Sequence, residues 1–296
     1  MNAAPTEKST TARTSRRPRA PAWVRSGMQV AGKVAPAVAA QVAAKVFFSP
    51  QRQRPKADEH LVLSRGEAFS LTVMGEAVQG WAWGKGPTVL LVHGWSGYAG
   101  QLANFVPALE HAGFRVVAVD LPGHGASGGQ SSSLVHGARA LEQVDHLFGP
   151  LHGLLAHSFG AACAGLAMAW GLKVERAVFV APSARFDDFW ERFRDGLGVS
   201  QQVFDRMVHD AEGRLQVRFE DVLPLKLAPR QEAPLLVIHD RHDREIPLEE
   251  GERLSRAWPN ASLWETHGLG HLRILKDPQV VARAVDAFRG ASPPAP

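Results

Sequence analysis

The sequence predicts an α/β fold, in which a mostly parallel sheet carries helices on both faces. Three apolar runs rich in β-branched residues, at 88–92, 115–120 and 234–238, have the composition of strands buried on both sides. Segments with the helical spacing of apolar residues separate these runs, and such alternation is typical of a parallel sheet. With 296 residues and 45% hydrophobic content, the chain can fill the core of one α/β domain with extensions.

The other elements follow from local patterns along the chain. Tryptophan and valine in 78–83 alternate with small or polar residues, which favours a half-exposed edge strand. An earlier strand is expected at 68–75, and three later ones bring the sheet to eight strands. These later strands are expected at 153–155, 176–181 and 261–266. Helices are expected at 98–112, 132–148, 159–171, 248–257 and 277–289.

The segment Ala156-His157-Ser158-Phe159-Gly160 places a serine between an apolar run and a helix of small residues. A strand that turns sharply into a helix at a serine holds its hydroxyl clear of both elements, an arrangement called a nucleophile elbow. The usual pattern is Gly-x-Ser-x-Gly. Gly160 suits the point where strand and helix nearly touch, and Ala156 replaces the first glycine with the smallest other side chain.

Four further segments accompany this elbow in a fixed order. They are the glycine-rich loop 93–97, the turn 121–127, the loop 239–247 and the segment 268–271. The elbow and these segments together resemble the α/β-hydrolase family over roughly residues 66–290. The resemblance implies that family's eight-stranded sheet, a short helical cap and a site at the carboxyl edge of the sheet.

The resemblance implies a serine hydrolase in which Ser158 is the nucleophile, His271 the base and Asp243 the acid that orients the base. A serine hydroxyl is a weak nucleophile at neutral pH and needs a base within hydrogen-bond reach. Histidine suits this role because its usual pKa lies near the working pH, and a buried carboxylate fixes its tautomer. The chain order Ser, Asp, His is the one expected for this fold.

Other carboxylates remain open as the acid. Asp240 stands where the family usually has glycine, whereas residues 246–247, Ile-Pro, follow Asp243 as the family's pattern requires. We expect the side chain of Asp240 to bond the backbone of its own turn. Asp187 or Asp188 would take the role if the acid followed the preceding strand, as it does in some relatives.

The resemblance further implies an oxyanion hole formed by the backbone N–H groups of Trp95 and Phe159. Serine as nucleophile implies acyl transfer, because family members that cleave carbon–halogen bonds or epoxides use aspartate instead. The expected function is that of a carboxylesterase acting on small or medium apolar esters through an acyl-enzyme. A thioesterase, a lactonase or a C–C hydrolase with the same triad is the alternative, and a non-catalytic scaffold that binds a small molecule is another.

Residues 182–233 lie between two expected core strands and interrupt the alternation of strand and helix. In the family such an insertion is a cap over the site. Four aromatic residues in it have the spacing of one helix face. They are Phe186, Phe189, Trp190 and Phe193. They are expected to line the substrate pocket, or to anchor the cap on the core.

No cofactor is predicted, because the chain has neither a phosphate-binding glycine loop nor a dinucleotide fingerprint. His239, His242 and Asp243 have a spacing that could bind zinc. The loop 239–247, which carries the expected acid, accounts for the same residues, so no metal is predicted. Cys163 is the single cysteine, which excludes an internal disulfide.

Residues 1–56 form a basic extension that differs from the hydrolase domain expected over 57–296. They carry eleven Lys or Arg and one Glu, a net charge of +10, while the whole chain has +4. The remainder is therefore acidic, at −6. Residues 1–22 have the composition of a disordered tail, and 24–48 is predicted to be helical. The helical segment has a valine at every fourth position, namely Val30, Val34, Val38, Val42 and Val46.

Three interpretations of the extension remain open. It is a helix docked on its own domain, a basic amphipathic helix on an anionic membrane surface, or a targeting segment marked by its arginines. Pro36 is expected to bend the helix or to begin it. No run approaches the roughly eighteen apolar residues of a membrane span, and no basic patch with interleaved aromatics predicts a nucleic-acid partner. We expect a cytoplasmic enzyme with a small-molecule ester substrate, and peripheral membrane contact through the extension stays an open alternative.

Overall fold

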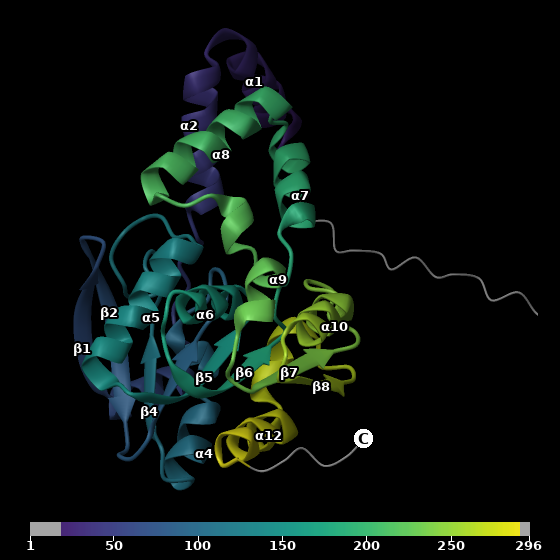
Figure 1. The fold of residues 1–296 in the computed structure, drawn as a ribbon. Helices are drawn as coiled ribbons and strands as arrows, with labels where there is room; N and C mark the ends of the chain where they lie inside the picture. Colours follow the sequence, from purple (N-terminus) through teal and green to yellow (C-terminus); the bar gives the residue numbers. More distant parts are fainter. Residues whose placement is uncertain (1–18, 291–296) are drawn as a thin grey trace, which may run out of the picture.

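The computed structural model describes residues 19–290, apart from the side chains of Asp187 and Asp188. Its centre is an eight-stranded sheet with the order β1-β2-β4-β3-β5-β6-β7-β8 (Figure 1). The strands are β1 (Glu67–Val73), β2 (Glu76–Trp83), β3 (Thr88–Val92), β4 (Arg115–Val119), β5 (Leu151–His157), β6 (Val174–Val180), β7 (Leu235–Asp240) and β8 (Ala261–Thr266). Strand β2 pairs antiparallel with β1 and β4, and the other pairs are parallel. The predicted α/β fold with a mostly parallel sheet is confirmed.

The prediction that 78–83 forms an edge strand is wrong. Strand β2 lies between β1 and β4, and the two edges of the sheet are β1 and β8. The alternation in β2 has a different physical cause, since antiparallel strands can expose one face to water wherever they stand in a sheet. Val78, Gly80 and Trp83 are buried, while Gln79, Trp81 and Ala82 are only half-buried.

Two apolar cores lie on opposite faces of the sheet. Helices α5 (Leu134–Phe148), α6 (Phe159–Ala169) and α10 (Leu248–Ala257) cover one face, and α4 (Phe105–His111) and α12 (Pro278–Phe288) cover the other (Figure 1). Helix α3 (Ala57–Arg65) and a short helix α11 (Gly270–Arg273) complete the elements around the sheet. The helix predicted over 98–112 is divided into a single turn, Ala99–Leu102, and α4. Pro107 explains the late start of α4, because proline is tolerated in the first turn of a helix but not in its interior.

The segment expected to form the cap contains α7 (Asp187–Leu197), α8 (Gln201–Leu215) and α9 (Pro224–Leu227). The basic extension forms two helices, α1 (Ala22–Val34) and α2 (Pro36–Phe48), where the sequence predicts one over 24–48. The break falls at Ala35, which has φ −142° and ψ 68°. Proline lacks an N–H group and restricts the residue before it, so Pro36 ends one helix and begins the next.

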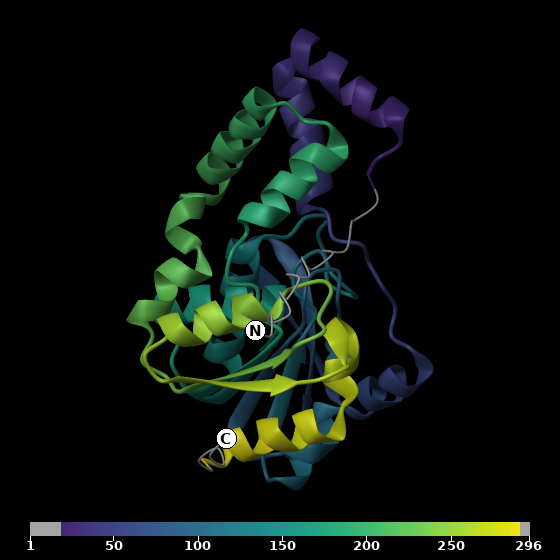
Figure 2. The ribbon, with the colours of Figure 1, turned by 90° about the vertical axis from the view of Figure 1, so that its right-hand side faces the viewer.

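The extension packs against α7 and α8, at the end of the molecule opposite α12 (Figure 2). Its buried side chains are mostly alanines of α2, which lie against apolar residues of α8. This cluster contains Met28, Ala39, Ala40, Ala43, Ala44, Val199, Val203 and Met207. The valines at every fourth position lie on the other side of the two helices and are exposed. The extension therefore docks through its alanines, and its valines remain free of the cap.

Within residues 19–290 the structure has no helix long and apolar enough to cross a membrane.

Candidate active site

Ser158 lies between the end of β5 and the start of α6, with φ 52° and ψ −119°. A positive φ is uncommon for a residue other than glycine and marks a strained turn. Gly160 allows this turn, because a Cβ atom there would lie 2.4 Å from the carbonyl oxygen of His93. No side chain fits in that space, so the elbow requires glycine at this position.

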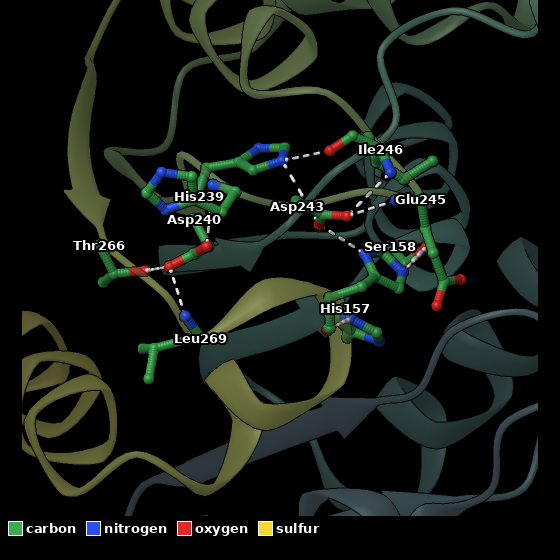
Figure 3. Close-up of polar contacts among 11 residues, drawn as sticks. His157, Ser158, His239, Asp240, Asp243, Glu245, Ile246, Thr266 and Leu269 are labelled. Carbon is green, nitrogen blue, oxygen red and sulfur yellow. Dashed lines mark hydrogen bonds and ion pairs between the residues drawn. The ribbon is translucent and has the colours of Figure 1, made fainter. Parts of the chain in front are cut away.

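His271 connects the side chains of Ser158 and Asp243, which are far apart in the sequence. Its Nδ1–H donates to Asp243 Oδ2 over 2.7 Å. A carboxylate can only accept hydrogen bonds, so this contact fixes the tautomer and leaves Nε2 as an acceptor. The hydroxyl of Ser158 lies 3.1 Å from Nε2. Figure 3 shows Asp243 and Ser158 on either side of this connection.

The carboxylate of Asp243 is fully buried and every contact holds it in one orientation. Its Oδ1 accepts from the N–H groups of Glu245 (2.8 Å) and Ile246 (3.0 Å), while Oδ2 faces His271. A buried carboxylate is stable only when such donors replace water. The loop after β7 therefore folds around this side chain.

Asp240 has a different set of partners (Figure 3). Its carboxylate accepts from the Thr266 hydroxyl and from the N–H groups of His242 and Leu269, each over 2.9 Å. Burial raises the pKa of Asp240, but hydrogen bonds from Leu269 and its neighbours outweigh it, and the pKa is lowered overall. Asp240 thus ties together the loops after β7 and β8, while Asp243 is the carboxylate that contacts His271. The alternatives Asp187 and Asp188 have side chains outside the described residues.

Two buried histidines support the loops that carry His271 and Asp243. His157 Nε2–H donates to the backbone carbonyl of His271 over 3.0 Å, and the two rings lie 4.6 Å apart between centroids. His239 Nε2–H donates to the carbonyl of Ile246 over 3.0 Å. Burial lowers the pKa of both His157 and His239, so both are neutral donors. Neither role was predicted from the sequence, although each histidine stands at the carboxyl end of a buried strand.

The three residues considered as zinc ligands do not converge on one point. His239 Nε2 lies 3.7 Å from Asp243 Oδ2 and donates to the carbonyl of Ile246, whereas His242 Nδ1 accepts from the N–H of Gly268 over 3.2 Å. In the part of the chain that the structure describes, no three His, Cys, Asp or Glu side chains gather in a way that could hold a metal ion.

The loop after β3 lies directly against the elbow. A Cβ atom on Gly94 would stand 3.1 Å from Cβ of Ser158, so the backbone that leads into Trp95 passes beside the serine. The rings of Trp95 and Phe159 contact edge to face, with centroids 5.0 Å apart. The backbone N–H groups of both residues have no hydrogen-bond acceptor among the residues described.

The extension reaches the rim of this site. The N–H of Gln51 donates to the hydroxyl of Ser96 over 2.9 Å, and Ser96 has the left-handed φ of 56°. The guanidinium of Arg52 donates to the carbonyls of Gly125 (2.8 Å) and Gly129 (2.6 Å), in the loop after β4. These contacts hold two loops of the site against the segment that follows α2.

Three of the four aromatic residues expected to line a substrate pocket or to anchor the cap gather around Phe47, near the end of α2. Ring centroids of Phe189, Trp190 and Phe193 lie 5.4, 5.4 and 4.8 Å from that of Phe47. Phe186 precedes α7, and its carbonyl accepts from the N–H of Trp190 over 2.9 Å. Three of the four therefore join the cap to the extension. This is an anchoring contact with α2, a partner that was not predicted from the sequence.

Known proteins resemble both the sequence and the fold. A pimeloyl-[acyl-carrier protein] methyl ester esterase of Chromobacterium violaceum is 27% identical over 250 residues, covering 68% of this chain and 94% of that protein. An esterase of the same name from Methylococcus capsulatus is 52% identical over 44 residues, which span 15% of this chain and only 17% of that protein.

Among solved structures, the carboxylesterase CesB of Bacillus subtilis is similar with a TM-score of 0.60 and 20% identity, over 79% of this chain and 96% of that one. The meta-cleavage product hydrolase of Pseudomonas fluorescens has a TM-score of 0.58 and 19% identity, over 76% and 98%. At these identities, both structures are similar to this chain in fold alone. The sequence profile of the alpha/beta hydrolase family matches residues 89–284, two thirds of the chain. The chain belongs to the alpha/beta hydrolase family.

Proposed function

We propose that the protein is a serine carboxylesterase that acts on small or medium apolar esters. The observation that carries the proposal is the position of His271, which lies 3.1 Å from the hydroxyl of Ser158 and 2.7 Å from the carboxylate of Asp243. This is the geometry of a nucleophile, a general base and an orienting acid. The esterase names of relatives that match this chain support the choice of an ester bond.

In the proposed reaction, Ser158 Oγ attacks the ester carbonyl carbon while Nε2 of His271 takes the hydroxyl proton. The tetrahedral intermediate then collapses, the bond to the alcohol breaks, and the alcohol leaves with the proton from Nε2. A water molecule next gives a proton to Nε2 and attacks the acyl-enzyme. The carboxylic acid is released and the proton returns to Ser158. Asp243 keeps its charge throughout and stabilises the imidazolium of His271.

The negative charge on the former carbonyl oxygen requires donors that are already in place. The N–H groups of Trp95 and Phe159 are our candidates, because both lie beside Ser158 and neither has an acceptor within the described chain. Phe159 also begins α6, whose amino end favours negative charge. The loss of one such donor typically lowers turnover by a factor of about 10²–10³.

A thioesterase, a lactonase or a C–C hydrolase would use the same side chains. The acyl and leaving-group pockets distinguish these activities, and the esterase of C. violaceum, which is matched over 94% of its length, favours an ester. A non-catalytic scaffold is disfavoured, because a binding protein has no need of a buried, oriented acid–base–nucleophile arrangement.

A panel of p-nitrophenyl esters and acyl thioesters of graded acyl length tests the proposal. We expect hydrolysis that is fastest for short or medium apolar acyl groups and absent for Ser158→Ala. Ser64→Ala, an exposed serine of α3, is the matched control and should keep full activity. Cleavage of thioesters alone would replace the ester assignment. Hydrolysis that persists in Ser158→Ala would contradict the proposed nucleophile.

A further inference from the structure

The two helices of the extension expose an apolar face to solvent. We define the valine face as Trp23, Val30, Val34, Val38, Val42 and Val46. These side chains are between 46% and 80% exposed, whereas α2 buries four alanines and α1 buries Met28. Five large apolar residues at four-residue spacing contrast with the scattered apolar residues that ordinary protein surfaces carry. An exposed apolar patch of this kind indicates a contact with another surface.

The charged residues of the two helices that carry the valine face have a single sign. Neither α1 nor α2 contains an acidic residue, and Lys33 and Lys45 are exposed beside the valines. Neither lysine pairs with an acidic group in the part of the chain that the structure describes. In the sequence, residues 1–18 add four Lys or Arg and one Glu just before α1. An apolar row with cations beside it is complementary to a surface that combines apolar and anionic groups.

We propose that the valine face is a docking surface for an anionic lipid bilayer. The valines and Trp23 would enter the boundary between headgroups and acyl chains, while Lys33 and Lys45 would contact anionic headgroups. A second copy of the chain is a poorer occupant. Two valine faces stacked on each other would bring lysines together without any carboxylate of α1 or α2 to neutralise them.

The position of the valine face suits such an occupant. Helices α1 and α2 form the outer end of the molecule, opposite α12, so a flat surface can approach them without meeting the sheet (Figure 2). Helix α8, with its acidic residues, packs on the alanine side of α2 and not on its valines. Gln51 and Arg52, which follow α2, contact the rim of the active site. A docked protein would therefore hold its cap side toward the bilayer.

Vesicle sedimentation of the full-length protein tests the proposal. The probes are vesicles of phosphatidylcholine alone and of phosphatidylcholine mixed with phosphatidylglycerol. We expect binding to the anionic vesicles and little to the neutral ones, with a loss at high salt because screening weakens attraction between surface charges. Val34→Ser combined with Val42→Ser, and Lys33→Glu combined with Lys45→Glu, should each lower the partition coefficient at least about tenfold.

Matched controls separate docking from folding and from catalysis. Leu147→Ser removes an equally exposed apolar residue on α5, and Lys85→Glu reverses a charge far from the valine face in sequence. Both should bind like the wild type. Ser158→Ala should also bind fully, so that a failure of the proposed esterase leaves this test intact. Hydrolysis of a soluble ester should be unchanged in the valine and lysine variants.

Three results would overturn the proposal. The wild type could stay in the supernatant with anionic vesicles, or it could bind both kinds of vesicle equally. Sedimentation velocity could instead show a dimer that the Val34→Ser and Val42→Ser pair dissociates. That third result would assign the valine face to a second copy of the chain.

Discussion

The chemistry of the site depends on how individual side chains are held. Asp243 has each of its oxygens occupied, one by two backbone N–H groups and the other by His271. His271 is held in turn at its ring by Asp243 and at its carbonyl by His157. Such preorganisation allows a base to accept a proton without first searching for its orientation.

Asp243→Asn is expected to lower kcat for ester hydrolysis by about 10³–10⁴, because an amide favours the wrong tautomer of His271. Asp240→Asn should act mainly on the stability of the loops after β7 and β8, and it should retain far more activity. Steady-state kinetics of both variants, with circular dichroism to establish folding, measure the difference. If Asp240→Asn is the more impaired of the two, the acid has been misassigned.

His157→Phe is expected to lower kcat about tenfold while KM stays nearly constant. The phenyl ring fills the space of the imidazole, but the hydrogen bond to the carbonyl of His271 is lost. Such a bond is worth about 1–1.5 kcal/mol. His157→Gln offers a side-chain donor and should recover part of the loss. A change in Tm with kcat unaltered would reduce His157 to a purely structural residue.

At the scale of elements, α6 provides a direct comparison between two glycines. A Cβ atom at Gly160 would clash with the backbone of β3 at His93, whereas one at Gly165 would meet nothing within 4 Å. The first glycine is a requirement of the elbow. The second only weakens the helix, since glycine is less favourable than alanine in a helix interior.

Gly160→Ala is expected to lower the free energy of unfolding by about 1–3 kcal/mol, because the clash can be relieved only by moving α6 away from β3. Ester hydrolysis should fall with it, since Ser158 begins the same turn. Gly165→Ala, the matched control, should leave activity intact and raise stability by up to about 1 kcal/mol. Urea denaturation and kinetics of the pair test this. Equal effects of the two substitutions would show that the elbow is not tightly packed.

The comparison of elements also shows what a sequence can predict. Buried strands such as β3 and β7 are recognisable because continuous apolar runs have few other uses in an α/β chain. Residues at the ends of such strands meet at one edge of the sheet, so the encounter of Ser158, Asp243 and His271 could be expected from the family's motifs. The place of β2 inside the sheet could not, because alternation reports exposure of a face and not the number of neighbouring strands.

The extension shows a second limit of prediction from sequence. Its periodicity indicates a helix with two distinct sides, but the valine and alanine rows of α2 have the same spacing. Which row is buried depends on α8, a partner some 160 positions later in the chain, whose approach small alanine side chains permit. Likewise, Phe47 is the partner of Phe189 and Phe193 although nothing in their local pattern connects them. Contacts between distant segments are not encoded in the pattern of either one.

For the whole molecule, buried neutral histidines determine how stability depends on pH. Burial lowers the pKa of His93 from 6.5 to about 3 and that of His124 to about 4. Between these values and 6.5 the unfolded chain binds protons that the native state does not, so stability rises with pH in this range. Burial raises the pKa of Asp120 to about 6, which opposes the trend because the native state then holds the extra proton.

The free energy of unfolding is therefore expected to fall when the pH is lowered from 7 to 5. Each histidine that stays neutral in the native state contributes a slope of about 1.4 kcal/mol per pH unit. The two lowered histidine pKa values change this slope more than the single raised carboxyl pKa does. The lowered pKa values of His157 and His239 increase the slope further. Urea denaturation at intervals of pH measures the slope. A free energy that is constant or rises toward pH 5 would mean that these histidines are not buried.

The central claim is that Ser158 is a nucleophile activated by its contact with His271. The most direct measurement is the intact mass of the protein after treatment with a fluorophosphonate, followed by identification of the modified peptide. We expect one adduct, located on Ser158, in the wild type, none in Ser158→Ala, and much slower modification of His271→Ala. A folded wild type that remains unmodified, or an adduct on a different residue, would contradict it.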